Sequence, residues 1–247
     1  DFCLSGGLGD VYKRQALNAA ASETQLARFA QYAELLKDWN QRMNLTAITD
    51  DDGIAVKHFL DSVLPLYYLD FPPGAALADI GTGAGFPGLP LKIMRPDLEV
   101  TLIDSLQKRV RFLETVCGAL ALEGVRCVHG RAEELGKAPQ YRENFDMVAS
   151  RAVANLKVLC EYCLPFIKTG GVFVALKAEA VEEELVEARP MIGTLGGAVE
   201  QVAEAVLPES GIVRKLVVIR KEKPTPAQFP RRANQIKTGK RISKKEL

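Results

Sequence analysis

The sequence predicts an α/β fold in which a doubly wound, mostly parallel sheet ends in an antiparallel strand pair and is preceded by a helical cap. Between residues 74 and 192, short apolar runs of strand length alternate with longer segments of helical periodicity, the pattern of repeated β-α units. Only residues 208–211 separate the last two apolar segments, 198–207 and 212–220. Because so short a connection cannot hold a helical crossover, this last pair is expected to be antiparallel.

Residues 16–73 are predicted to form the helical cap. From 16 to 40 the apolar positions, among them Leu26, Phe29 and Leu36, recur every three or four residues, which is typical of an amphipathic helix or a pair of helices. Residues 54–68 resume a helical pattern until two prolines and a glycine at 72–74 stop it. Residues 1–15 show no periodicity and are interpreted as a leader foreign to the native protein.

Residues 74–222 are predicted to form the core, and together with the cap they are expected to make one integrated domain from 16 to 222. The parallel strands are predicted at residues 76–81, 99–104, 125–129, 145–150 and 171–177. The helices between them are predicted at residues 88–94, 106–120, 155–167 and 180–192. Ligands of open parallel sheets bind beyond the carboxyl ends of the strands, so polar residues at those ends are candidates for a site.

The turn after the first strand is the most informative segment. An apolar run, 76–80, leads into Gly81, Gly83 and Gly85, and a helix start that carries Pro87 and Pro90 follows. Glycines let the backbone approach a ligand without a Cβ in the way, and proline is tolerated in a first helical turn. Strand, glycine turn and helix start together predict a nucleotide-type site.

The residues around this turn bear on which cofactor binds. Asp104, nineteen residues after Gly85, ends the second strand, where its carboxylate can accept both hydroxyls of a ribose and can also cap the next helix. Residues 83–88 satisfy the dinucleotide pattern G-x-G-x-x-G as well, so NAD stays open. Three observations favour S-adenosylmethionine. Asp79 precedes the glycines, where it could hold a cationic amino acid moiety. The sheet is expected to end in an antiparallel pair, and no substrate domain follows.

Several stretches carry a resemblance to a known family. Residues 79–88 (DIGTGAGFPG) and 102–113 (LIDSLQKRVRFL) resemble the bacterial small-subunit ribosomal RNA guanine-N7 methyltransferases, also called glucose-inhibited division protein B. Residues 44–46, 58–62, 150–152 and 175–177 are similar to the same family, and residues 229–232 (FPRR) look like its Y-P-R-[KR] segment. The likeness runs from about residue 17 to the tail.

The resemblance implies a class I, Rossmann-like methyltransferase that moves a methyl group from S-adenosylmethionine to N7 of a guanine in 16S ribosomal RNA. It implies contacts with the methyl donor at Gly81, Phe86, Ala132, Glu133 and Arg151. Phe86 could close over the methyl donor, and Ala132 and Glu133 follow the third strand, although Glu133 is equally well explained as an acid at a helix start.

Guanine N7 has an in-plane lone pair, so no general base is needed and positioning is expected to carry catalysis. Arg151 and Lys177 are then expected to position the reactants by gripping anionic groups, either the carboxylate of the methyl donor or substrate phosphates.

Positive charge is concentrated at the end of the chain. From Arg214 onward there are twelve Lys or Arg against two acids, so this part carries +10 and the remainder −9. Residues 223–247 are therefore predicted to be a basic tail without packed apolar side chains that contacts RNA phosphates, a solvated tail being the alternative. The residues expected to bind RNA are Arg231, Arg232, Lys237, Lys240, Arg241 and His58. For His58 a hydrogen bond to Asp61 that braces the cap is equally open.

Other classes are disfavoured by composition. No apolar run approaches the roughly 20 residues that span a bilayer, so a soluble cytoplasmic protein, expected to be a monomer, is predicted. The four cysteines of the core, at 117, 127, 160 and 163, are expected to be reduced and buried, and their spacing predicts no metal site. Two alternatives remain: an NAD-dependent oxidoreductase, and a non-catalytic RNA-binding or ribosome assembly factor on a methyltransferase scaffold.

Overall fold

The computed structural model describes residues 21–178, 180–207 and 210–238. Residues 1–15, interpreted as a leader, and Lys240 and Arg241 of the basic tail lie outside this part of the chain. The described strands form one sheet in the order β3-β2-β1-β4-β5-β7-β6. Their bounds are β1 Ala76–Ile80, β2 Glu99–Asp104, β3 Val125–His129, β4 Phe145–Arg151, β5 Ile167–Ala178, β6 Gly197–Val206 and β7 Val213–Lys221. Strands β1 to β5 are parallel, and β7 pairs antiparallel with both β5 and β6, so the predicted fold class is confirmed.

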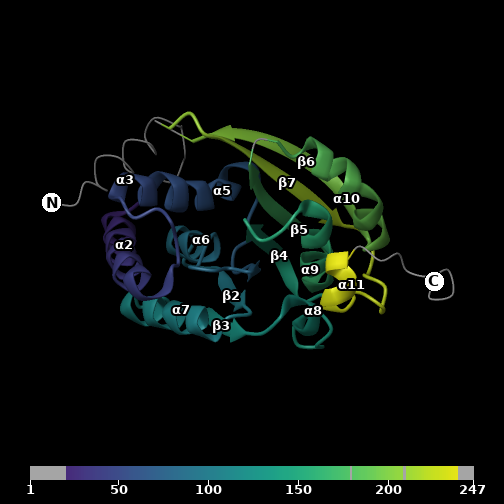
Figure 1. Cartoon of the computed structure of the whole chain (residues 1–247), viewed down its shortest axis with the longest axis horizontal. Helices are drawn as coiled ribbons and strands as arrows, with labels where there is room; N and C mark the ends of the chain where they lie inside the picture. Colours follow the sequence, from purple (N-terminus) through teal and green to yellow (C-terminus); the bar gives the residue numbers. More distant parts are fainter. Residues whose placement is uncertain (1–20, 179, 208–209, 239–247) are drawn as a thin grey trace.

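Helices cover both faces of the sheet (Figure 1). On one side lie α2 Glu23–Met43, α3 Asp51–Gly53, a π-helical segment Ile54–Leu60, α4 Asp61–Val63, α5 Pro65–Tyr68, α6 Gly88–Met94 and α7 Gln107–Ala119. On the other side lie α8 Ala132–Leu135, α9 Leu156–Cys163 with a 3-10 turn Leu164–Phe166, α10 Glu182–Thr194 and α11 Ala233–Thr238. None of these helices is long and apolar enough to cross a membrane.

The side chains of the sheet alternate between two buried clusters. In β5, Val172 and Val174 pack with α6 and the cap, whereas Phe173 and Ala175 pack with α9 and α10. Because successive side chains of a strand point to opposite faces, a strand that is buried on both faces is apolar throughout. This explains why the core strands appear in the sequence as continuous apolar runs.

The cap is fixed to the core through the helix α2. Ser22 and Gln25 form a reciprocal capping box at its start, and the Gln25 side chain also donates to the carbonyl oxygens of Ile93, at 3.0 Å, and Met94, at 3.1 Å. The buried face of α2 includes Phe29 and Tyr32. These contacts place the cap directly against the helix that follows the glycine turn.

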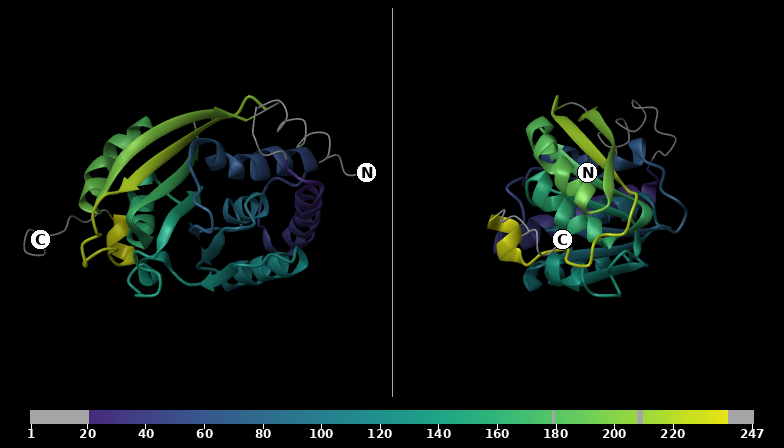
Figure 2. Two further views of the ribbon diagram at one scale, coloured as in Figure 1. Left: turned by 180° about the vertical axis from the view of Figure 1, so that it is seen from behind. Right: turned by 90° about the vertical axis from the view of Figure 1, so that its right-hand side faces the viewer.

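The long strands β6 and β7 form the far edge of the sheet and extend towards the cap (Figure 2). The Tyr68 hydroxyl at the end of α5 donates to the carbonyl oxygen of Glu204 in β6 at 3.0 Å. The start of β7 also lies next to cap residues about 150 positions earlier in the chain, since Arg214 contacts Asp61 across a separation of 153 residues.

The described part of the basic tail, residues 223–238, is packed on the core, which corrects the prediction that it has no packed apolar side chains. Phe229 is fully buried and Ile236 is 3% exposed. The Arg142 guanidinium donates to the carbonyl oxygens of Thr225 at 2.7 Å and Phe229 at 2.8 Å. These charge-assisted hydrogen bonds hold the tail against the core, although its polar composition would predict exposure to solvent.

Candidate functional site

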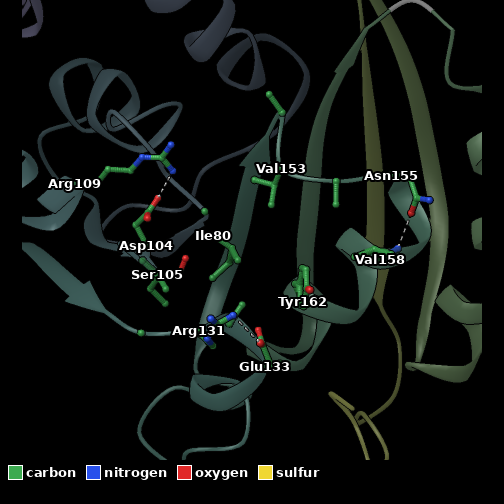
Figure 3. A pocket seen from close by; sticks show the side chains of 16 residues that line it. Ile80, Asp104, Ser105, Arg109, Arg131, Glu133, Val153, Asn155, Val158 and Tyr162 are labelled. Atoms are coloured by element: carbon green, nitrogen blue, oxygen red, sulfur yellow. Dashed lines mark hydrogen bonds and ion pairs between the residues drawn. The ribbon is translucent and has the colours of Figure 1, made fainter. Parts of the chain in front are cut away.

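A cavity of about 540 Å³ lies at the carboxyl ends of β1 to β4 (Figure 3). We call it the first cavity. Its walls come from the glycine turn, the end of β2, the start of α8 and the side of α9. The predicted site residues that line it are Gly81, Asp104, Ala132 and Glu133. A cavity therefore lies at the edge of the sheet where open parallel sheets bind their ligands.

Backbone geometry explains the glycines of the turn. Gly81 has a φ of +71°, and a Cβ there would lie 2.7 Å from Cγ2 of Val153. Gly85 has a φ of +98°, and a Cβ there would lie 2.5 Å from the Tyr32 hydroxyl oxygen. Both positions combine a left-handed backbone with a close neighbour, so a side chain at either would force the turn away from the cap or from the cavity wall.

Asp104 connects the glycine turn to the end of β2. Its Oδ2 accepts from the Gly83 amide at 3.0 Å and its Oδ1 from the Leu106 amide at 2.9 Å, while Arg109 lies 3.4 Å away. The carboxylate is 3% exposed and still lines the first cavity. Asp104 thus lies at the start of a helix and also faces the cavity. The sequence suggested both a capping role and a ligand-binding role for it, and this position is compatible with both.

Across the cavity, Glu133 is the second buried carboxylate (Figure 3). It lies in the first turn of α8, 9% exposed, and its Oε1 is 3.8 Å from Nη1 of Arg131. Val158 and Tyr162 of α9 form an apolar wall beside it. The first cavity therefore offers carboxylate acceptors from β2 and α8 and an apolar surface from α9.

Asp79 does not line the cavity. It is fully buried behind the turn, where its Oδ2 accepts from the Thr82 hydroxyl at 2.6 Å and from the Gly88 amide at 2.7 Å. Burial raises the pKa of Asp79 to about 6, and its Oδ1 has no hydrogen-bond partner among the described residues. In this geometry Asp79 braces the turn, whereas the sequence placed it at the amino acid moiety of a ligand.

Phe86 is also placed differently from the sequence expectation. Its ring is 5% exposed and is enclosed by Tyr32, with centroids 5.6 Å apart, and by His58, with centroids 4.6 Å apart. The Arg151 guanidinium lies over the ring, 4.8 Å from its centroid. Phe86 lines neither of the cavities described here, so it joins the turn to the cap and does not close over the first cavity.

Arg151 and Lys177 face a different hollow, a second cavity of about 450 Å³ at the ends of β4 and β5 and the start of β7. Its polar lining consists of Lys57, His58, Asp61, Arg151, Lys177, Glu184 and Arg214. Ala152 lines both cavities. Lys177 is held by Glu184, with Nζ and Oε2 2.7 Å apart, and by the carbonyl oxygen of Ala154 at 3.0 Å.

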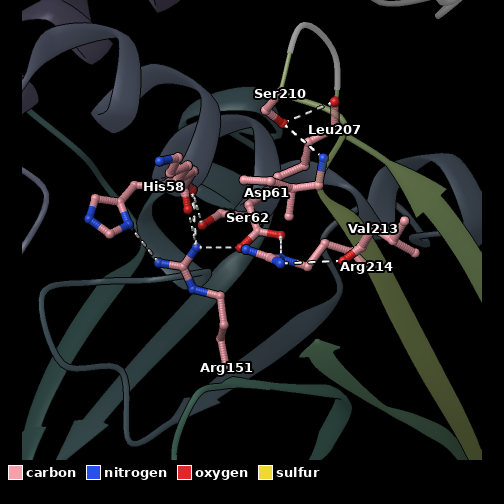
Figure 4. Close-up of polar contacts among 10 residues, drawn as sticks. His58, Asp61, Ser62, Arg151, Leu207, Ser210, Val213 and Arg214 are labelled. Carbon is pink, nitrogen blue, oxygen red and sulfur yellow. Dashed lines mark hydrogen bonds and ion pairs between the residues drawn. The ribbon is translucent and has the colours of Figure 1, made fainter. Parts of the chain in front are cut away.

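Asp61 is the centre of the second cavity (Figure 4). Its carboxylate is 2% exposed and binds two guanidinium groups, Arg151 Nη1 at Oδ2 and Arg214 Nε at Oδ1, each at 2.8 Å. The sequence analysis missed Arg214 as a site residue and paired Asp61 with His58. No local pattern could reveal this cluster, because its three members come from the cap, β4 and β7.

His58 contacts Arg151 instead of Asp61. Its Nδ1 accepts from Arg151 Nη2 at 3.3 Å, since arginine can only donate, and Nε2–H then donates to the Thr46 hydroxyl oxygen at 2.7 Å. Burial, together with the charge of Arg151, lowers the pKa of His58 to about 4. His58 is therefore a neutral brace at physiological pH.

The predicted RNA-binding residues of the tail divide into two kinds. Arg231 is turned inward, where its Nη2 lies 2.6 Å from Oε2 of Glu161, a carboxylate that is 1% exposed. The geometry thus gives Arg231 a structural role, which argues against the RNA contact expected from the sequence. Arg232 is exposed and lines a surface hollow with Arg131 and Lys137. Lys237 lies in α11.

The prediction that all four core cysteines are buried holds for only two of them. Cys160 and Cys163 of α9 are buried, but Cys117 and Cys127 are half-buried, with their sulfur atoms 4.0 Å apart. No cluster of three or more His, Cys, Asp or Glu side chains with metal-binding geometry is found in the described parts of the chain.

Solved structures show which fold this chain shares. The solved structure of a protein from Bacillus halodurans C-125, named a putative methyltransferase, matches with a TM-score of 0.50 at 14% identity, over 66% of this chain and 100% of that chain. TYW2 of M. jannaschii, solved in complex with AdoMet, matches with a TM-score of 0.52 at 15% identity, over 70% of this chain and 77% of that chain. At this identity the likeness shows the fold alone, and that fold is the class I methyltransferase fold.

Sequence relatives define the family. Residues 25–213 match the family model described as rRNA small subunit methyltransferase G, GidB. The chain is 48% identical over 223 residues to ribosomal RNA small subunit methyltransferase G of Clostridium novyi, covering 87% of this chain and 92% of the relative. It is 50% identical over 212 residues to the protein of the same name from Exiguobacterium sibiricum, covering 86% and 89%. The chain belongs to the rRNA small subunit methyltransferase G family and is a methyltransferase, which confirms the resemblance and does not favour the oxidoreductase or the non-catalytic alternative.

Proposed function

We propose that the protein transfers a methyl group from S-adenosylmethionine to N7 of a guanine in small-subunit ribosomal RNA, either naked or in a ribosomal particle. The observation that carries this proposal is the first cavity, where two buried carboxylates, Asp104 and Glu133, flank a glycine turn. The family name of the relatives supports ribosomal RNA as the substrate.

The residues of the first cavity fit the methyl donor. Asp104 and Glu133 would accept hydrogen bonds from its hydroxyl and amino groups, and Val158 and Tyr162 would provide apolar surface for its adenine ring. Gly81 leaves room for the ligand beside the strand end. When bound, S-adenosylmethionine supplies an electrophilic methyl group on a sulfonium.

Methylation at guanine N7 needs no general base, and the aspartates around the two cavities are all engaged in other contacts. Asp61, Asp79 and Asp104 each accept hydrogen bonds from cations or from the backbone and hydroxyl groups of the turn. None of the three is placed as a general base in the described part of the chain. A nitrogen with a free lone pair, such as guanine N7, needs no proton removed, so positioning of the two reactants is sufficient.

The experiment is methylation of small ribosomal subunits, or of their naked RNA, with methyl-labelled S-adenosylmethionine, followed by mapping of the labelled base. The expected result is label at N7 of one guanine. An RNA that carries 7-deazaguanine at that position is the matched control, because it lacks only the acceptor atom, and it should take up no label there. Label at an adenine, a cytosine or another guanine atom would contradict the proposal.

A further inference from the structure

The second cavity has an arrangement of charge that the methyl donor site does not explain. Four cations, Lys57, Arg151, Lys177 and Arg214, share it with two carboxylates, Asp61 and Glu184. Because His58 is neutral, the cavity carries a net charge of +2. Such a charge in a partly enclosed site attracts an anion.

The four cations differ in how strongly they are already held. Arg151 is held by several groups: Nη1 donates to Asp61 at 2.8 Å and to the carbonyl oxygen of Lys57 at 3.0 Å, Nη2 contacts His58, and the guanidinium lies over Phe86. Lys177 is paired with Glu184 and is 13% exposed. Arg151 and Lys177 are therefore held in the cavity wall by other groups of the protein, whereas the sequence suggested that they grip an anion.

Arg214 and Lys57 keep donors for a ligand. Arg214 Nε binds Asp61 and Nη1 binds the carbonyl oxygen of Val213, but Nη2 has no partner among the described residues, and the side chain is 22% exposed. Lys57 is exposed at the rim of the same cavity. The buried carboxylate of Asp61 fixes the direction of the Arg214 guanidinium, so its free donor is held in place before a ligand arrives.

The two cavities meet at one residue. Ala152 lines both, and it holds a left-handed backbone with a φ of +55° although it is not a glycine. A strained position of this kind persists only where the surroundings impose it, and such positions cluster at functional sites. A ligand in the second cavity would therefore lie next to a methyl donor held in the first.

We propose that the second cavity is the acceptor side of the active site, where Arg214 and Lys57 bind a phosphate of the RNA segment that carries the target base, with Asp61 as a positioning residue. This inference rests on the proposed function. A phosphodiester matches the net charge and the planar guanidinium donor, and it is present in any RNA substrate irrespective of sequence.

The first test is steady-state methylation with Arg214→Gln and Lys57→Gln. The control is Arg42→Gln, which removes the same charge from an exposed arginine of α2 that lines neither cavity. The two cavity variants should raise the RNA KM about tenfold and reduce the salt slope of RNA binding by about one unit each. Their affinity for S-adenosylhomocysteine should be unchanged, and Arg42→Gln should resemble the wild type. An unchanged RNA KM in Lys57→Gln, whose exposed side chain is not needed for folding, would overturn the proposal.

The second test finds the phosphate itself. Target RNAs that each carry one neutral methylphosphonate near the target guanine should include one that raises the KM of the wild type but not of Arg214→Gln, because the variant has already lost that contact. If every methylphosphonate affects both enzymes equally, the contact does not exist. A wild-type enzyme that methylates no RNA would instead refute the proposed function, so the two failures are distinguishable.

The positioning role of Asp61 has its own readout. In Asp61→Asn the carboxylate charge that holds the two guanidinium groups is lost, so the RNA KM should rise while the affinity for S-adenosylhomocysteine stays within twofold of the wild type. An equal loss of affinity for both ligands would show a merely structural role.

Discussion

The hydroxyl of Tyr32 donates a hydrogen bond to the carbonyl oxygen of Ala84, which joins the long helix of the cap to the glycine turn of the core. Tyr32 is completely buried, and burial raises the pKa of its hydroxyl well above the ordinary value, so it stays a hydrogen-bond donor at every practical pH. The cap is therefore joined directly to the glycine turn, whose first residue, Gly81, lines the first cavity.

Tyr32→Phe should lower the free energy of unfolding by about 1–2 kcal/mol, because the buried carbonyl oxygen of Ala84 loses its donor. The looser turn should also weaken S-adenosylhomocysteine binding several-fold. Chemical denaturation and calorimetry measure the two effects. Tyr68→Phe is the matched control, since its hydroxyl bonds to Glu204 at an exposed position, and it should change neither quantity noticeably. If both variants changed stability and S-adenosylhomocysteine affinity equally, the Tyr32 hydroxyl would have no particular role in holding the glycine turn.

Asp104→Ala should reduce affinity for S-adenosylhomocysteine at least tenfold, because the variant loses a cavity-lining carboxylate and the hydrogen bond that holds Gly83. Asp104→Asn keeps an oxygen for one backbone amide, so it should be more stable than the alanine variant yet still bind the ligand poorly. Asp97→Asn, which changes a carboxylate outside both cavities, is the control for calorimetry. Wild-type affinity in both Asp104 variants would exclude a role in ligand binding.

His58 should make the protein less stable as the pH falls from about 6.5 to 4. Its pKa is lowered to about 4 in the folded state, so within this window the unfolded chain binds a proton that the folded chain does not. The free energy of unfolding should fall by up to about 3 kcal/mol across the window and by no more below it.

Denaturation of the wild type and of His58→Asn at several pH values isolates this contribution. Asp79 titrates in the same window with the opposite sign, because its pKa is raised to about 6, but it is present in both proteins and cancels in the difference. Parallel curves for the wild type and His58→Asn would contradict the prediction.

Arg231→Gln should lower the free energy of unfolding by about 3 kcal/mol, because it leaves the buried carboxylate of Glu161 without its cation. Arg232→Gln removes the same charge from an exposed neighbour, so it should leave stability unchanged and weaken RNA binding. Thermal unfolding measures the stability of each variant, and the salt dependence of RNA binding measures the loss of a phosphate contact. A stable Arg231→Gln variant with weakened RNA binding would restore the RNA role that the sequence predicts for Arg231.

Local patterns predicted most of the sheet. The run 76–80 with its glycine turn, and the strand that ends at Asp104, are recognisable because burial on both faces requires continuous apolar residues and a left-handed backbone favours glycine. The antiparallel β6 and β7 follow from the shortness of their connection. The pairing of Arg231 with Glu161 could not be predicted, because it depends on how the tail folds back on α9, which composition does not encode.

By itself, the sequence determined the fold class, the edge of the sheet where the first cavity lies, and several residues that line this cavity, because each of these depends on periodicity or on spacing within one β-α unit. Only the tertiary structure decided which charges meet. Asp61, Arg151 and Arg214 belong to the cap, β4 and β7, and one buried carboxylate between two guanidinium groups exists only when all three elements pack together. That contact is electrostatic and long-range in sequence, whereas the patterns that a sequence displays are local.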